Sequence, residues 1–155
     1  MKIKELGLYV VCDEYLEKYY LKNYPTNKVD GERPFFICFK DNKNNDIYWI
    51  IPISSQIDKY KDIFKKYPNA GVIMHLFGEK DSAILTQNIV PIHKNLIKRE
   101  FTVSKIPFKI LKKESIKIIL KKARHVRALI SQNKIHNSSE VKDLYDKMVN
   151  YKKTS

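Results

Sequence analysis

The chain has 155 residues, 43% of them hydrophobic and 30% charged, which excludes a disordered tail and a membrane protein and allows a substantial hydrophobic core. Thirty Lys and Arg residues against 17 Asp and Glu residues give a formal net charge of +13. The apolar run at the start of the chain ends at Asp13 and Glu14, far below the length of a signal peptide or a membrane span. We therefore expect a single domain over residues 1–155, located in the cytoplasm, with Cys12 and Cys38 as reduced thiols.

Apolar, β-rich runs predict strands in the first half of the chain, and helical spacing of apolar residues predicts the helices between them. In chain order we expect a strand at 7–12, a helix from Asp13 to about Tyr20, a loop at 23–33, a hairpin of strands at 34–40 and 46–53, and a helix from Ser55 to Pro68. Ser55 followed by Asp58 resembles a capping box, which predicts that the Ser55 hydroxyl caps this helix.

The second half begins with strands and ends with helices. We expect strands at 70–77 and 82–89, a basic segment at 93–111 that is mostly loop with a short helix or strand, a long helix from Ser115 to about Gln132, and a last helix that begins at 137–139. Strands concentrated in the first half and helices in the second predict an α+β fold, with a compact antiparallel sheet or partly open barrel and flanking helices.

The positive charge is segregated along the chain. Residues 1–60 contain 9 basic and 9 acidic side chains, whereas residues 61–155 contain 21 basic and 8 acidic ones, and the segment 94–134 contains 13 basic and 2 acidic ones. Such a field attracts polyanions, of which nucleic acid is the commonest in a cell. The alternative is a generally lysine-rich composition whose surface charge has no specific partner.

The basic residues of the predicted long helix and the segment before it form a candidate phosphate-binding face. They are Lys109, Lys112, Lys113, Lys117, Lys121, Lys122, Arg124 and Arg127. A solvated helix face is the alternative, but such faces usually interleave both signs of charge.

Common enzyme motifs are absent from the sequence. It contains no GxxxxGK[ST], GxGxxG, HExxH or CxxC motif, and its acidic residues do not cluster as in a two-metal nuclease. We therefore expect no metal and no nucleotide cofactor.

The stretch PISSQIDKY at 52–60 is the best candidate site. Ser54 and Ser55 lie where a strand turns into a helix, a place that favours anions, and Lys59 can add charge one turn later. The alternative, favoured by the spacing alone, is that Ser55 is a helix cap and Ser54 a turn residue.

Two further residues are candidates for chemistry on a phosphate. Arg33, before the strand that follows Pro34, offers a guanidinium that can grip a phosphate through two hydrogen bonds. His75, inside the apolar strand GVIMHLF, has a side chain suited to proton transfer near neutral pH. The alternatives are a solvated loop arginine and a core or rim histidine.

Taken together, the segments RPFFICFKDNKNNDIYWIIPISSQIDKYKDIFKK, DSAILTQNIVPI and KKARHVRALI resemble the toxins of type III toxin–antitoxin systems, specifically the CptN branch of the ToxN/AbiQ family. The resemblance implies a MazF/Kid (PemK-like) fold and a metal-independent endoribonuclease. It also implies an RNA partner: an antitoxin made of pseudoknot repeats, which the toxin cuts from a precursor and which holds it inactive in a closed ring-like complex. No DNA partner is expected.

The resemblance assigns roles to individual residues. It places Arg33 at the basic loop-to-strand position of the family and Ser54 and Ser55 at its Thr/Ser–Ser pair. Relatives often continue with Pro and Lys, where this chain has Gln56 and Ile57, so Lys59 supplies the basic group. His75 matches the nearest branch alone. A non-catalytic, ribosome-associated RNA-binding protein is the alternative function.

Overall fold

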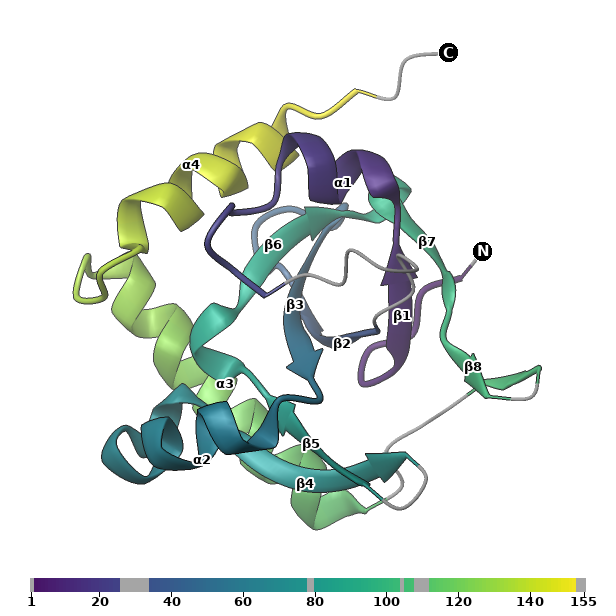
Figure 1. Cartoon of the computed structure of the whole chain (residues 1–155). Coiled ribbons are helices and arrows are strands. Elements are labelled where there is room, and N and C mark those ends of the chain that lie inside the picture. The colour runs from purple at the N-terminus through teal and green to yellow at the C-terminus, as the bar shows by residue number, and fades with distance from the viewer. Residues whose placement is uncertain (1, 26–33, 78–79, 104, 108–111, 153–155) are drawn as a thin grey trace.

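A computed structural model of the chain describes residues 2–25, 34–77, 80–103, 105–107 and 112–152 (Figure 1). The elements are β1 (Leu8–Val11), α1 (Asp13–Lys18), β2 (Phe35–Lys40), β3 (Ile47–Ser54), α2 (Ile57–Lys66), η1 (Pro68–Ala70), β4 (Val72–Phe77), β5 (Lys80–Ile84), η2 (Thr86–Asn88), β6 (Val90–His93), η3 (Lys94–Leu96), β7 (Ile97–Glu100), β8 (Thr102–Val103), β9 (Ile106–Pro107), α3 (Lys113–Ser131) and α4 (Ser138–Val149).

Seven strands form one antiparallel sheet in the order β4-β5-β3-β2-β1-β7, with β6 also paired to β3. The first part of β3, Ile47–Ile50, pairs with β6, while its end, Ile53–Ser54, pairs with β5. Within the described residues, β6 and β7 are joined by η3 and do not pair with each other, so the curved sheet stays open. The α+β fold predicted from the sequence, an open antiparallel sheet with flanking helices, is confirmed.

Both faces of the central strands are buried, because α1 and α4 cover one face and α3 covers the other (Figure 1). On β2, Phe35 and Ile37 face the cluster that includes Leu144 of α4, whereas Phe36 faces the cluster that includes Ile119 of α3. This two-sided burial explains why the strands are continuous apolar runs without a polar alternation. Within the described residues, no helix is both long enough and apolar enough to cross a bilayer.

A third, smaller cluster holds α2 against the hairpin of β4 and β5. Tyr60 and Phe64 of α2 pack there with Ala83 and Ile73. Gly71, just before β4, allows the close approach, because a Cβ atom at this position would overlap both the Phe64 ring and the carbonyl oxygen of Ile84. The helix that follows Ser55 is therefore fixed to the strand that carries His75.

Three predictions about local structure were wrong. Helix α2 begins at Ile57, and its N-cap is Gln56 without a side-chain hydrogen bond, so Ser55 is not the cap. The strand expected at 82–89 ends at Ile84 and is followed by the 3₁₀ turn η2. The segment 93–111 was expected to be mostly loop with a short helix or strand; its described part is more regular than that, because it contains η3 and the short strands β7, β8 and β9.

Candidate active site and nucleic-acid interface

The two serines at the end of β3 have different environments. Ser54 is 2% exposed, and its Oγ accepts a hydrogen bond from the backbone N–H of Gln56 at 3.1 Å. Ser55 is exposed, and among the described residues its hydroxyl makes no hydrogen bond, although its carbonyl accepts from Ile57 N at 2.9 Å. Ser54 thus shapes the turn, while the Ser55 hydroxyl is free to bind a ligand.

His75 lies on the same face of the sheet as Ser54. Ser54 pairs with Ala83 and Ala83 pairs with Ile73, so these three side chains form one row, and His75 follows Ile73 by two residues. Two strand spacings separate β3 from β4, which puts His75 about 10 Å or more from Ser54. The histidine cannot take a proton from the serine directly, but a nucleotide bound between them could contact both.

The His75 side chain is accessible to such a ligand. Its Nδ1 lies 3.8 Å from Oδ1 of Asp81, its neighbour across the β4–β5 ladder, and the two side chains are 57% and 56% exposed. A carboxylate at that position can orient the imidazole. With more than half of its side chain exposed, His75 is not a core residue.

Lys59 and Arg33 are the expected sources of positive charge. Lys59 is exposed in the first turn of α2, with its Nζ 5.4 Å from the centroid of the Tyr60 ring. Arg33 lies outside the described residues. The chain enters β2 beside the end of β3, however, because Phe35 pairs with Pro52, two residues before Ser54.

The basic residues of α3 divide into two groups. Lys113, Lys117, Lys121 and Arg124 are exposed and recur at helical spacing, so they form a solvent-facing stripe, and Lys112 is exposed just before it. Lys109 lies outside the described residues. The stripe presents unpaired positive charge, since none of these side chains has a carboxylate within salt-bridge distance among the described residues.

Lys122 and Arg127 instead point into the protein. The Lys122 ammonium donates to the carbonyl oxygens of Pro68 and Gly71, and burial lowers its pKa. The Arg127 guanidinium donates to Asp41 Oδ1 at 3.1 Å and stacks over Trp49, with its Cζ 5.2 Å from the ring centroid. Both side chains hold α3 on the rest of the fold.

Asp41, which belongs to no motif in the sequence, is the centre of this second contact. Its carboxylate accepts hydrogen bonds from Trp49 Nε1 (3.0 Å), Tyr145 Oη (2.7 Å), Arg127 Nη2 (3.1 Å) and the backbone N–H groups of Lys43 (3.1 Å) and Asn44 (3.0 Å). Burial by itself would raise the pKa of Asp41, but the hydrogen bonds outweigh it and the pKa is lowered. Burial, together with the bond to Asp41, raises the pKa of Tyr145 to about 12. A spacing rule could not find this cluster, since its members lie on β3, α3, α4 and the β2–β3 loop.

Among the described residues, no three His, Cys, Asp or Glu side chains gather in a way that could hold a metal ion. The candidate site residues that the structure describes offer hydroxyl, imidazole and ammonium groups, which can donate hydrogen bonds to phosphate oxygens.

The chain is similar over nearly its whole length to two solved structures. One is described as "A processed non-coding RNA regulates a bacterial antiviral system"; it has 16% sequence identity and a TM-score of 0.69, and the match covers 95% of this chain and 99% of that one. The other is described as "Structure and activity of AbiQ, a lactococcal anti-phage endoribonuclease belonging to the type-III toxin-antitoxin system"; it has 18% identity and a TM-score of 0.67, and the match covers 96% and 98%. No protein-family model and no curated protein matches the chain. At these identities the similarity shows a shared fold.

Proposed function

We propose that this protein is the endoribonuclease toxin of a type III toxin–antitoxin system, in the CptN branch of the ToxN/AbiQ family. It would act in phage defence, process the repeat-derived pseudoknot RNA that inhibits it, and be held by that RNA in a closed ring-like complex. The observation that carries the proposal is the end-to-end fold similarity to AbiQ, which is described as an endoribonuclease. The free Ser55 hydroxyl, which follows Ser54 at the end of β3, supports it.

The proposed reaction uses the chemistry of RNA itself. The 2′-oxygen attacks the adjacent phosphorus, the bond from phosphorus to the 5′-oxygen breaks, and the products are a 2′,3′-cyclic phosphate and a 5′-hydroxyl. One proton leaves the 2′-hydroxyl for a base, and one is delivered to the departing 5′-oxygen. No covalent enzyme intermediate and no metal is required, so the protein has to align the groups, stabilise charge and move protons.

The side chains at the end of β3 suit these tasks. The Ser55 hydroxyl can donate to a non-bridging phosphate oxygen, and Ser54 keeps the turn in place through its bond to Gln56. Lys59, and Arg33 outside the described residues, would stabilise the negative charge of the transition state. His75 is the first residue to test as acid or base, because its exposed imidazole lies where a bound nucleotide could reach it.

The solvent-facing stripe of α3 is the proposed antitoxin contact. Lys113, Lys117, Lys121 and Arg124, with Lys109 and Lys112 before them, would pair with phosphates of the folded RNA. Lys122 and Arg127 would contribute by holding α3 in position rather than by touching RNA.

The test is cleavage of single-stranded RNA by the purified protein in excess EDTA, with the product ends identified by mass spectrometry. We expect cleavage and 2′,3′-cyclic phosphate ends. Complete loss of activity in EDTA that magnesium or manganese restores would overturn the metal-independent mechanism. Tight RNA binding without any cleavage would favour the non-catalytic RNA-binding alternative.

A Ser55→Ala variant locates the chemistry within the protein. Exposed Ser139 at the start of α4 provides the matched control, since Ser139→Ala removes the same hydroxyl from a distant surface. We expect cleavage to fall sharply in Ser55→Ala and to be unchanged in Ser139→Ala, with both proteins folded. Equal activities would remove the end of β3 from the mechanism.

A further inference from the structure

A groove of about 650 Å³ lies between the C-terminal half of α3, the helix α4 and the β2–β3 loop. Its lining includes Lys43, Trp49, Arg124, Ala128, Lys142 and Tyr145. The volume is within the usual range for small-ligand sites, roughly 300–1,000 Å³. Trp49 lies five residues before Ser54 on the same strand, so the groove is about 17 Å from the candidate active site.

The wall of the groove is preformed. The rings of Trp49 and Tyr145 stack with centroids 5.9 Å apart and an interplanar angle of 15°. Asp41 accepts a hydrogen bond from each of them, and the Arg127 guanidinium also packs on the Trp49 ring. Because these contacts already fix the side chains, binding of a ligand would cost little side-chain conformational entropy.

The rim of the groove carries excess positive charge. Among the described residues, no carboxylate lies within salt-bridge distance of Lys43, Arg124 or Lys142, and Lys142 Nζ donates only to Asn133 Oδ1, at 3.0 Å. Asp41 and Arg127 neutralise each other, which leaves Asp146 as the one opposing carboxylate in the lining. Three cations against one carboxylate favour an anionic ligand.

The groove also continues the solvent-facing stripe of α3. Arg124 belongs to both, and Lys121 and Lys117 lead from it along the helix toward the N-terminal half of α3. The same helix contacts η1 through Lys122 and the β2–β3 loop through Arg127, so it spans the distance between the β4 side of the protein and the groove. Figure 1 shows α3 running from the neighbourhood of β4 to α4.

We propose that this groove binds one unpaired nucleotide of an RNA that is bound along α3, an inference that rests on the proposed function. The phosphates on the two sides of this nucleotide would contact Lys43, Arg124 and Lys142, and the base would pack against Tyr145 and Ala128. A groove of this size with an aromatic and aliphatic wall suits a single splayed base better than a duplex, and unpaired bases are the parts of RNA that proteins usually read.

The binding test uses an oligonucleotide that the protein cannot cut. A single strand of about 12 nucleotides is long enough to span 17 Å, since a stacked strand rises about 3.4 Å per nucleotide. A 2′-O-methyl group on every ribose blocks attack by the 2′-oxygen, so binding is measured whether or not the protein is a nuclease. Affinity is measured by fluorescence anisotropy over a range of salt concentrations.

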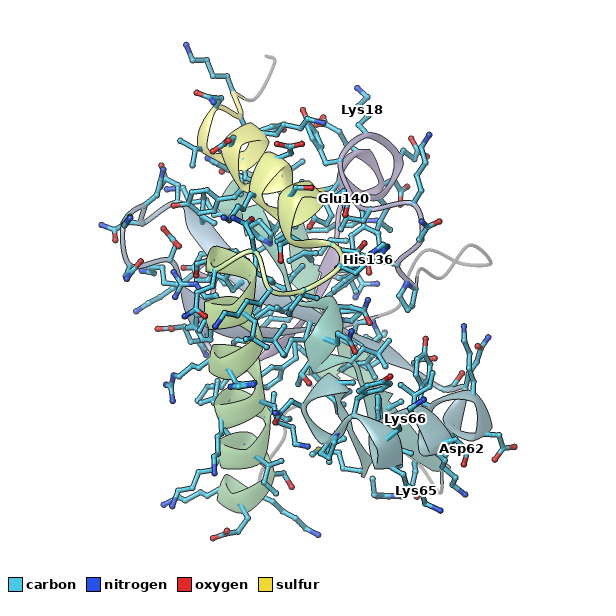
Figure 2. All side chains as sticks on the ribbon, turned by 90° about the vertical axis from the view of Figure 1, so that its left-hand side faces the viewer. Lys18, Asp62, Lys65, Lys66, His136 and Glu140 are labelled. Carbon is cyan, nitrogen blue, oxygen red and sulfur yellow. The ribbon has the colours of Figure 1, made fainter. Side chains whose placement is uncertain are left out.

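The Lys43→Ala/Lys142→Ala variant should bind this strand more weakly and with a salt slope lower by about 1.4, because each phosphate contact on a single strand contributes about 0.7. The control is Lys18→Ala/Lys147→Ala, which removes the same charge from exposed lysines outside the groove; Lys18 on α1 is labelled in Figure 2. The control should keep the parental slope. Equal slopes for the two double variants would overturn the proposal.

A crosslink identifies what occupies the groove. One 4-thiouridine in the same strand should, on irradiation, attach to the peptide that contains Tyr145, as read by mass spectrometry. Crosslinks confined to other peptides would overturn the proposal. It would also be overturned if the Lys43→Ala/Lys142→Ala variant lost binding of an acidic peptide such as polyglutamate but bound the RNA as tightly as the parent protein. Absence of RNA cleavage by the parent protein would count against the proposed nuclease and leave this binding result intact.

Discussion

The carboxylate of Asp41 provides the sharpest test of how this fold is held together. Asp41→Asn keeps the size of the side chain but removes its charge and replaces one acceptor oxygen with an NH₂ group. Trp49 Nε1, Tyr145 Oη, Arg127 Nη2 and the backbone amides of the β2–β3 loop would then face a donor or a weaker acceptor. The variant therefore disrupts a contact among β3, α3 and α4 without creating a cavity.

The loss of unfolding free energy expected for Asp41→Asn depends on how deeply the Asp41–Arg127 ion pair is buried. Removing one partner of a buried ion pair costs about 3–5 kcal/mol of unfolding free energy. The side chain of Asp41 is 2% exposed, but that of Arg127 is 29% exposed, so the arginine keeps part of its hydration. We therefore expect a loss near the lower end, about 3 kcal/mol, which is a large share of the roughly 5–15 kcal/mol that stabilises a typical domain.

The assay is urea unfolding at pH 7, followed by the fluorescence of Trp49, the one tryptophan in the chain, which donates directly to Asp41. The matched control is Asp46→Asn on the same loop, because the ion pair of Asp46 with Lys94 joins two side chains that are about half exposed. The control should unfold close to the parent.

The pH dependence has a defined sign. The pKa of Asp41 is lowered in the folded protein, so its contribution is fully present above the unfolded pKa of about 3.9 and is lost as the pH falls through the folded pKa. The difference in unfolding free energy between the parent and Asp41→Asn should thus be constant from pH 7 to pH 5 and shrink below about pH 4. Equal urea midpoints at pH 7, or a difference that does not shrink in acid, would refute the reasoning.

Other variants test the remaining contacts. Ser54→Ala should lower RNA cleavage less than Ser55→Ala, because Ser54 only accepts a bond within the turn; the rates are compared on one RNA substrate, and the reverse order would contradict the assignment. Lys122→Met should lower kcat/KM for RNA more than it weakens RNA binding, since it removes the bonds to Pro68 and Gly71 but no surface charge of the stripe; a selective loss of binding would make it an RNA contact. The triple variant Lys113→Ala/Lys117→Ala/Lys121→Ala should bind folded RNA with a salt slope lower by up to about 2–3, and an unchanged slope would make the stripe a solvated face. Gly71→Ala should lower the unfolding free energy by about 1–3 kcal/mol in a urea titration, and parental stability would contradict the tight packing before β4.

Sequence alone predicted the parts of the fold that depend on local pattern. The apolar run of β3 is buried along its whole length, and the long helix expected from Ser115 to about Gln132 is present as α3, whose buried residues Ile119, Ala123, Val126 and Ile130 recur at helical spacing. Periodicity is a property of neighbouring residues, and it is therefore visible without knowledge of the partners they pack against. The sequence also indicated the turn at Ser54 and Ser55 as the candidate site, although the role of Ser55 as a helix cap was wrong.

The long-range contacts of individual residues could be determined only from the tertiary structure. Lys122 and Arg127 are basic residues of α3 like their exposed neighbours. Lys122, however, donates to the carbonyl oxygen of Gly71, 51 residues away in sequence, and Arg127 donates to the carboxylate of Asp41, 86 residues away. The segment Ile97–Glu100 contains three charged residues and reads as irregular by itself, but it becomes β7 because β1 supplies its hydrogen-bond partners. In the sequence Asp41 is an ordinary loop aspartate. Its hydrogen-bond donors lie on β3, α3 and α4, and only the folded chain places them around its carboxylate. Long-range hydrogen bonds and strand pairing leave no pattern among neighbouring residues of the sequence. The groove beside Tyr145 therefore could not be predicted from the sequence.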